Sequence, residues 1–132
     1  MIHANVRTED GFRIAHPPYQ RISLESQVVA EAIAVALAVR EPVATPNRTE
    51  YPRLATEYYS STGAKNHRQF MKDARYFEIS ASEEGFVLLP KINGGVTGSA
   101  RGFSPDDSKI ERFPANTRLH ELAIRIIDLI QK

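Results

Sequence analysis

Hydrophobic and polar residues alternate at the start of the chain, in two runs that a turn separates. Residues 2–7 place Ile, Ala and Val at every second position, and Phe12 and Ile14 resume the alternation after Thr8-Glu9-Asp10-Gly11. Alternation on both sides of a turn-forming segment predicts a β-hairpin. Pro17-Pro18 lacks two N–H donors, so we expect the second strand to break there, with another short extended piece over residues 19–24.

The period of the hydrophobic pattern then changes from two to that of a helix. Val29, Ala32, Ile33 and Leu37 fall at helical spacing and predict a helix over residues 26–39, which Pro42 closes. Residues 42–50 contain two prolines and no periodicity, so they predict a connecting loop.

Two short helices are predicted in the middle of the chain. Pro52 suits the first turn of a helix, which Gly63 ends; its shared face carries Leu54, Ala55 and Tyr58. Asn66-His67-Arg68-Gln69 resembles a capping box and predicts a second helix, whose expected buried face is Phe70, Met71 and Ala74.

The second half opens with another predicted hairpin, formed by residues 76–80 and 86–90 around the turn Ser82-Glu83-Glu84-Gly85. A glycine-rich loop over residues 94–105 and a short strand over 109–113 follow. Asn116 or Thr117 is expected to cap a closing amphipathic helix. Its expected buried residues are Leu119, Leu122, Ala123, Ile126 and Ile130.

The predicted fold class is α+β: a single domain over residues 1–132 of mostly antiparallel β-hairpins, covered by about four helices. The motifs Glu9-Asp10-Gly11-Phe12 and Glu83-Glu84-Gly85-Phe86 each precede a helix. They are compatible with a duplicated hairpin-and-helix unit, and equally with two independent α+β units.

Composition and charge narrow the functional classes. The 132 residues include no cysteine, which excludes disulfide scaffolds, thiolate zinc sites, iron–sulfur clusters and cysteine nucleophiles. The 17 basic and 16 acidic residues nearly cancel, which argues against a protein that coats nucleic acid. Neither a secretory signal nor an apolar run long enough to span a membrane is expected, so we predict a cytoplasmic protein.

No catalytic set, cofactor site or metal site is predicted. The four histidines, His3, His16, His67 and His120, contain no pair at the i,i+4 spacing of a helical zinc site. The glycine-rich loop lacks the pattern of a phosphate-binding loop and that of a nucleophile elbow. A small hydrolase in which His16 or His120 meets a loop carboxylate is kept as an alternative.

Two charged segments are candidates for binding. Lys65, His67, Arg68, Lys72 and Arg75 form a basic stretch, which predicts either a solvated helix face or, with tyrosines just upstream, a small RNA-binding module. The acidic pairs Glu83-Glu84 and Asp106-Asp107 are expected in loops. Such exposed carboxylates are ordinary solvated turns or a docking surface for a basic partner.

The stretch LATEYYSSTGAKNHRQFMKDARYFEI (residues 54–79) is similar to a known protein family. It resembles the immunity proteins of bacterial contact-dependent growth inhibition (CDI) systems, in which a short helix, a Gly-x-Lys turn, an aromatic-bearing helix and a strand follow in this order. The resemblance continues through EGFVLLP (residues 84–90), a glycine-containing loop and the closing helix, and covers residues 50–132. Asn66 departs from the Ser or Thr expected after the turn, although Asn caps a helix equally well.

The resemblance implies a protein that binds the toxic C-terminal domain of a cell-surface effector, commonly a nuclease, and neutralises it by occlusion without catalysing a reaction. From composition and motifs we expect no cofactor and no membrane, and nucleic acid is not the expected partner. A nuclease active site is basic, so acidic contact residues are expected on the immunity protein. The expected partner-binding residues are Glu83, Glu84, Asp106 and Asp107, with Tyr58 and Tyr59 as anchors.

Overall fold

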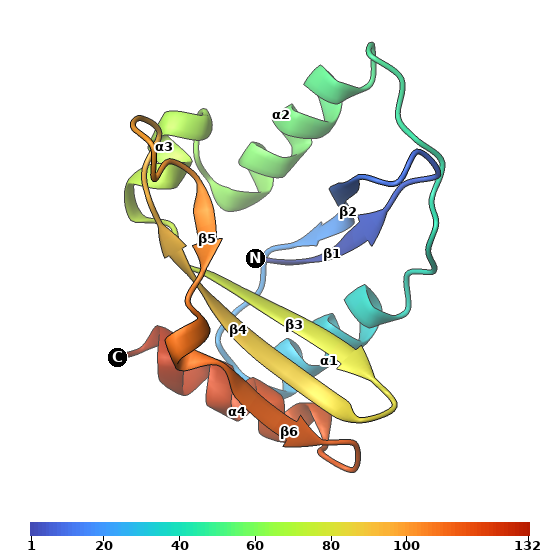
Figure 1. The fold of residues 1–132 in the computed structure, drawn as a ribbon, viewed down its shortest axis with the longest axis vertical. Coiled ribbons are helices and arrows are strands. Elements are labelled where there is room, and N and C mark those ends of the chain that lie inside the picture. Colours follow the sequence, from blue (N-terminus) through green and yellow to red (C-terminus); the bar gives the residue numbers. More distant parts are fainter. The chain divides into compact units, whose positions relative to one another are not determined.

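The computed structural model describes residues 1–132 and shows an α+β protein with four α-helices and two antiparallel sheets (Figure 1). The predicted fold class is therefore confirmed. The chain divides into two compact units. Unit 1 comprises residues 1–64 and 119–132, and unit 2 comprises residues 65–118.

Unit 1 begins with the predicted hairpin. Strand β1 (Ile2–Arg7) pairs antiparallel with β2 (Arg13–Gln20). Ala4 and Val6 are buried, Asn5 and Arg7 are exposed and His3 is half-buried, which largely follows the alternation. The hydroxyl of buried Thr8 donates a hydrogen bond to the Phe12 carbonyl at 3.0 Å and closes the turn.

The prediction that Pro17-Pro18 breaks the second strand is wrong, because β2 runs through both prolines. Ala4 pairs with His16 and Ile2 with Gln20, so three residues of β2 face one residue of β1 at this point. The prolines lie inside this irregularity of a two-stranded sheet, where no ladder hydrogen bond needs their missing N–H groups. The extended piece predicted over residues 19–24 stops at Gln20.

Helices complete unit 1. Helix α1 (Ser26–Leu37) ends two residues before the predicted boundary, and it packs against β1 and against α4 (Leu119–Ile130). Helix α2 (Tyr51–Thr62) ends at Gly63, whose φ of 81° provides the left-handed cap. None of the four helices is both long and apolar enough to cross a membrane. The buried positions of α1 and α4 include Val29, Ala32, Ile33, Leu122, Ala123 and Ile126.

Unit 2 contains helix α3 (His67–Asp73) and a four-stranded antiparallel sheet centred on β4 (Gly85–Asn93). One edge of β4 pairs with β3 (Tyr76–Ser82). The other edge is shared by β6 (Glu111–Pro114) near the start of β4 and by β5 (Phe103–Pro105) near its end. The strand predicted over residues 109–113 is displaced, because Asp107–Lys109 forms a 3-10 turn, η1.

Candidate functional site

The first predicted acidic pair, Glu83-Glu84, occupies the turn between β3 and β4, and both residues are exposed. The Ser82 hydroxyl oxygen accepts a hydrogen bond from the Glu84 amide at 3.2 Å and braces this turn. Both carboxylates are therefore presented to solvent on a short, ordered hairpin end.

The second acidic pair, Asp106-Asp107, begins the η1 turn. The Asp106 carboxylate accepts a hydrogen bond from the Ser108 hydroxyl at 2.6 Å and lies 3.8 Å from the Lys109 ammonium. Its side chain is only 19% exposed, whereas Asp107 is exposed. Asp106 is thus occupied by local partners, and Asp107 is the open carboxylate of the pair.

The structure separates the two acidic pairs along β4. Glu84 immediately precedes the first residue of β4, and the Asp106 amide donates a hydrogen bond to the carbonyl of Pro90 at 2.9 Å. The intervening residues of an extended strand span about 20 Å. The two pairs therefore form two acidic positions rather than one patch.

Tyr58 and Tyr59, the predicted anchors, lie on α2 and belong to unit 1, whereas all four acidic residues belong to unit 2. The Tyr58 ring packs edge-on against His3 and Tyr19, each with centroids 5.4 Å apart, and against Tyr59 at 5.5 Å. Burial raises the pKa of Tyr59 and lowers the pKa of His3, so the cluster favours neutral side chains. These rings attach α2 to the hairpin of unit 1.

The basic stretch folds as α3 with the predicted cap. The Asn66 side-chain oxygen accepts a hydrogen bond from the Gln69 amide at 2.9 Å. The Gln69 side chain reaches back as expected, but it accepts from the amide of Lys65 rather than from that of Asn66. This cap begins a helix only seven residues long, on which Arg68 and Lys72 are exposed. Lys65, also exposed, lies just before the cap.

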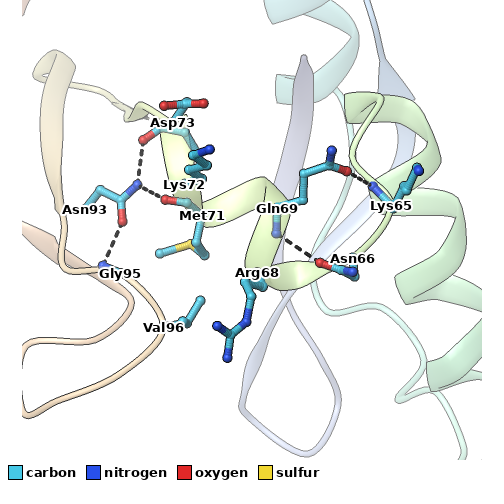
Figure 2. A pocket seen from close by; sticks show the side chains of 11 residues that line it. Lys65, Asn66, Arg68, Gln69, Met71, Lys72, Asp73, Asn93, Gly95 and Val96 are labelled. Carbon is cyan, nitrogen blue, oxygen red and sulfur yellow. Dashed lines mark hydrogen bonds between the residues drawn. The ribbon is translucent and has the colours of Figure 1, made fainter.

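A cavity of about 820 Å³ lies between α3 and the loop that follows β4 (Figure 2). Met71, which is 3% exposed, contributes buried apolar surface, and Val96 contributes apolar surface from the loop. The lining residues are Lys65, Asn66, Arg68, Gln69, Met71, Lys72, Asp73, Ala74, Asn93, Gly95 and Val96.

Asn93, a residue that the sequence did not single out, joins the two walls of this cavity. Its side-chain amide donates hydrogen bonds to the carbonyls of Met71 at 2.7 Å and Ala74 at 2.9 Å, and its oxygen accepts from the Gly95 amide at 2.9 Å. The only local signal is an Asn immediately before two glycines, which indicates a turn but not a partner 22 residues away.

The histidines of the hydrolase alternative lie elsewhere. His120 is exposed, as expected for a solvated helix position, and the half-buried His16 contacts the Pro17 carbonyl through Nδ1. Neither lines the cavity beside α3. No group of three or more His, Asp or Glu side chains is arranged to hold a metal ion.

No family model, curated protein or solved structure matches this chain.

Proposed function

We propose that this protein is an immunity protein of the CDI type, which binds the C-terminal toxin domain of a cognate effector in the cytoplasm and blocks its activity. The observation that carries the proposal is the order of elements from α2 to α4. Helix, Gly-x-Lys turn, helix, hairpin, glycine-containing loop and closing helix follow one another at the residues on which the family resemblance rests.

Two residues of that motif have a definite physical role in the structure. Gly63 adopts the left-handed conformation that ends α2, and Gly85 lies where a Cβ atom would come within 2.0 Å of the Phe113 carbonyl oxygen. Gly63 of the Gly-x-Lys turn and Gly85 of the Glu-Gly-Phe hairpin are therefore required by the local backbone. These backbone roles support a comparison of this chain with the CDI immunity family that is based on the order of its elements.

The mechanism under this proposal is stoichiometric occlusion. A stable interface of about 1,600 Å² would cover the active site of the toxin, with charge complementarity steering the encounter. The exposed carboxylates of Glu83, Glu84 and Asp107 suit a basic toxin surface. Because one active toxin molecule harms the cell, nanomolar or tighter binding is expected, on the order of −12 kcal/mol.

Co-expression tests the proposal. The toxin domain is taken from the large exoprotein encoded immediately upstream, and growth is followed with and without this protein. We expect restored growth and a stable one-to-one complex that survives purification. The control is the same toxin domain with an unrelated small cytoplasmic protein. Unrelieved toxicity and the absence of a complex would overturn the proposal.

Of the two features that an RNA-binding module needs, exposed cations and exposed aromatic rings beside them, α3 and its cavity provide only the cations. The cations of α3 are exposed, but no aromatic residue lines the adjacent cavity, and Tyr58 and Tyr59 pack with other rings in unit 1. Single-stranded RNA is held by bases stacked on aromatic side chains as well as by phosphate contacts. A fluorescence titration with single-stranded RNA, repeated at several salt concentrations, compares the two functions directly.

A further inference from the structure

We infer that the cavity beside α3 binds an acidic segment of the toxin domain that also inserts an apolar side chain, an inference that rests on the proposed function. This adds a basic recognition site to the acidic turns described above. The expected occupant is a protein segment that carries carboxylates and one apolar side chain.

The first observation behind this inference is the uncompensated positive charge around the cavity. The cavity is lined by Lys65, Arg68 and Lys72 but by only one carboxylate, Asp73. None of these three cations forms an ion pair in the structure. The other two lysines of unit 2 are paired: Lys91 lies 3.3 Å from Glu78, and Lys109 lies 3.8 Å from Asp106. Three unpaired cations thus line one cavity beside a single carboxylate, which favours an anionic occupant.

Apolar surface inside the cavity indicates that the occupant also carries an apolar side chain. Figure 2 shows the side chains of Met71 and Arg68 extending from α3 toward Val96 on the facing loop. A ligand that fills this space meets Val96 between the cations and, at the wall formed by α3, the small part of Met71 that is not buried. A carboxylate beside an aliphatic or aromatic side chain matches both features, and a chain of acidic and apolar residues supplies that combination.

The absence of aromatic residues from the lining separates a peptide from RNA. Phosphates would satisfy the three cations, but bases would have no ring on which to stack. An acidic peptide requires no stacking platform, because its carboxylates pair with Lys and Arg and its apolar side chain packs against Met71 and Val96. The lining therefore favours a protein segment.

The walls of the cavity are held in place before any ligand arrives. Asn93 joins the end of α3 to Gly95 through three hydrogen bonds. The glycine loop is closed by the Gly94 amide on the Gly102 carbonyl at 2.8 Å and by the Gly102 amide on the Gly95 carbonyl at 2.9 Å. A preformed site loses less conformational entropy on binding, which supports recognition rather than a chance hollow.

Charge reversal in the complete toxin complex tests the inference. The triple variant Lys65→Glu/Arg68→Glu/Lys72→Glu is expected to raise the Kd for the toxin domain at least about a hundredfold, and Val96→Asp about tenfold. The matched control is Arg112→Glu, which reverses an exposed cation of the same unit outside the cavity and is expected to change the Kd less than threefold. Circular dichroism checks that each variant is folded.

Carbodiimide crosslinking of the wild-type complex gives a second readout that needs no variant. The reagent joins carboxylates to neighbouring amines, and peptide mass analysis is expected to find Lys65 or Lys72 joined to an Asp or Glu of the toxin. Crosslinks confined to lysines outside the cavity would contradict the inference.

The outcomes separate this inference from the proposed function. A wild-type complex whose Kd the triple variant leaves unchanged overturns the cavity as a docking site and leaves the immunity function standing. Failure of the wild-type protein to bind the toxin overturns both. Salt-dependent binding of single-stranded RNA that the triple variant abolishes overturns the acidic peptide as the occupant.

Discussion

Gly85 begins β4 at a place where the chain leaves no room for a side chain. Its φ is 130°, a conformation that residues with a Cβ atom rarely adopt, and a Cβ would lie 2.0 Å from the Phe113 carbonyl oxygen. The nearby atom belongs to the backbone of β6, which pairs with β4 at Gly85 and Pro114. Gly85 of the Glu-Gly-Phe motif is therefore required for the pairing of β4 with β6.

Gly85→Ala is expected to lower the free energy of unfolding by about 3 kcal/mol, because both the backbone conformation and the contact with Phe113 become unfavourable. Gly11→Ala is the matched control: Gly11 also has a positive φ, of 93°, but nothing lies within 4 Å of its Cβ position. That variant is expected to lose about 1 kcal/mol. Urea unfolding measures both losses, and equal values would rule out the contact with β6 as the cause.

Helix α3 depends on its cap more than the longer helices do. Its seven residues are too few to form a helix in isolation, so the hydrogen bond from Gln69 to Asn66 and the burial of Met71 carry much of its stability. The same helix presents Arg68 and Lys72, two of the three cations of the candidate cavity. Loss of the cap is therefore expected to disturb the cations of the cavity as well as the helix.

Asn66→Ala is expected to destabilise the protein by about 1 kcal/mol, because the Gln69 amide loses its acceptor. Asn66→Asp keeps an acceptor at the same position and is expected to stay within a few tenths of a kcal/mol of the wild type. Hydrogen exchange of the α3 amides, followed by NMR, locates the effect. Equal protection of these amides in the alanine variant and the wild type would contradict the role of the cap.

At the scale of the whole molecule, the nearly neutral total conceals an uneven charge distribution. Unit 2 contains nine basic and seven acidic residues, and its exposed charges include the cations lining the cavity and the carboxylates of the acidic turns. A basic cavity and separate acidic turns on one unit can each meet a complementary charge on a partner. Such complementarity affects the rate of association and the choice of partner more than affinity alone.

Glu83→Lys/Glu84→Lys is expected to slow association with the toxin domain about tenfold at low salt, with a smaller effect at 0.5 M salt because ions screen exposed charges. Glu9→Lys/Asp10→Lys is the matched control, since this pair is also exposed at a hairpin turn but lies in unit 1. Stopped-flow mixing at two salt concentrations measures both rates. Identical association rates for the two double variants would remove the acidic turn from the interface.

The internal duplication suggested by the sequence remains a prediction, and the structure gives its two hairpins different surroundings. The first hairpin forms a two-stranded sheet, whereas the second lies in a sheet that also contains β5 and β6. The single domain predicted over residues 1–132 likewise stays a prediction, since the chain separates into two compact units.

The sequence by itself determined the local elements. Alternation, helical spacing, Gly63 and Asn66 each act within a few residues, so they predicted the hairpins, the helices and the cap near their observed positions. The tertiary structure decided what depends on residues far apart in the chain. The irregular register of β1 and β2 accommodates Pro17-Pro18. Asn93 donates hydrogen bonds to carbonyls 19 and 22 residues away in the chain, and these bonds join the walls of the cavity beside α3. No periodicity encodes such pairings, because they form only when distant segments pack together.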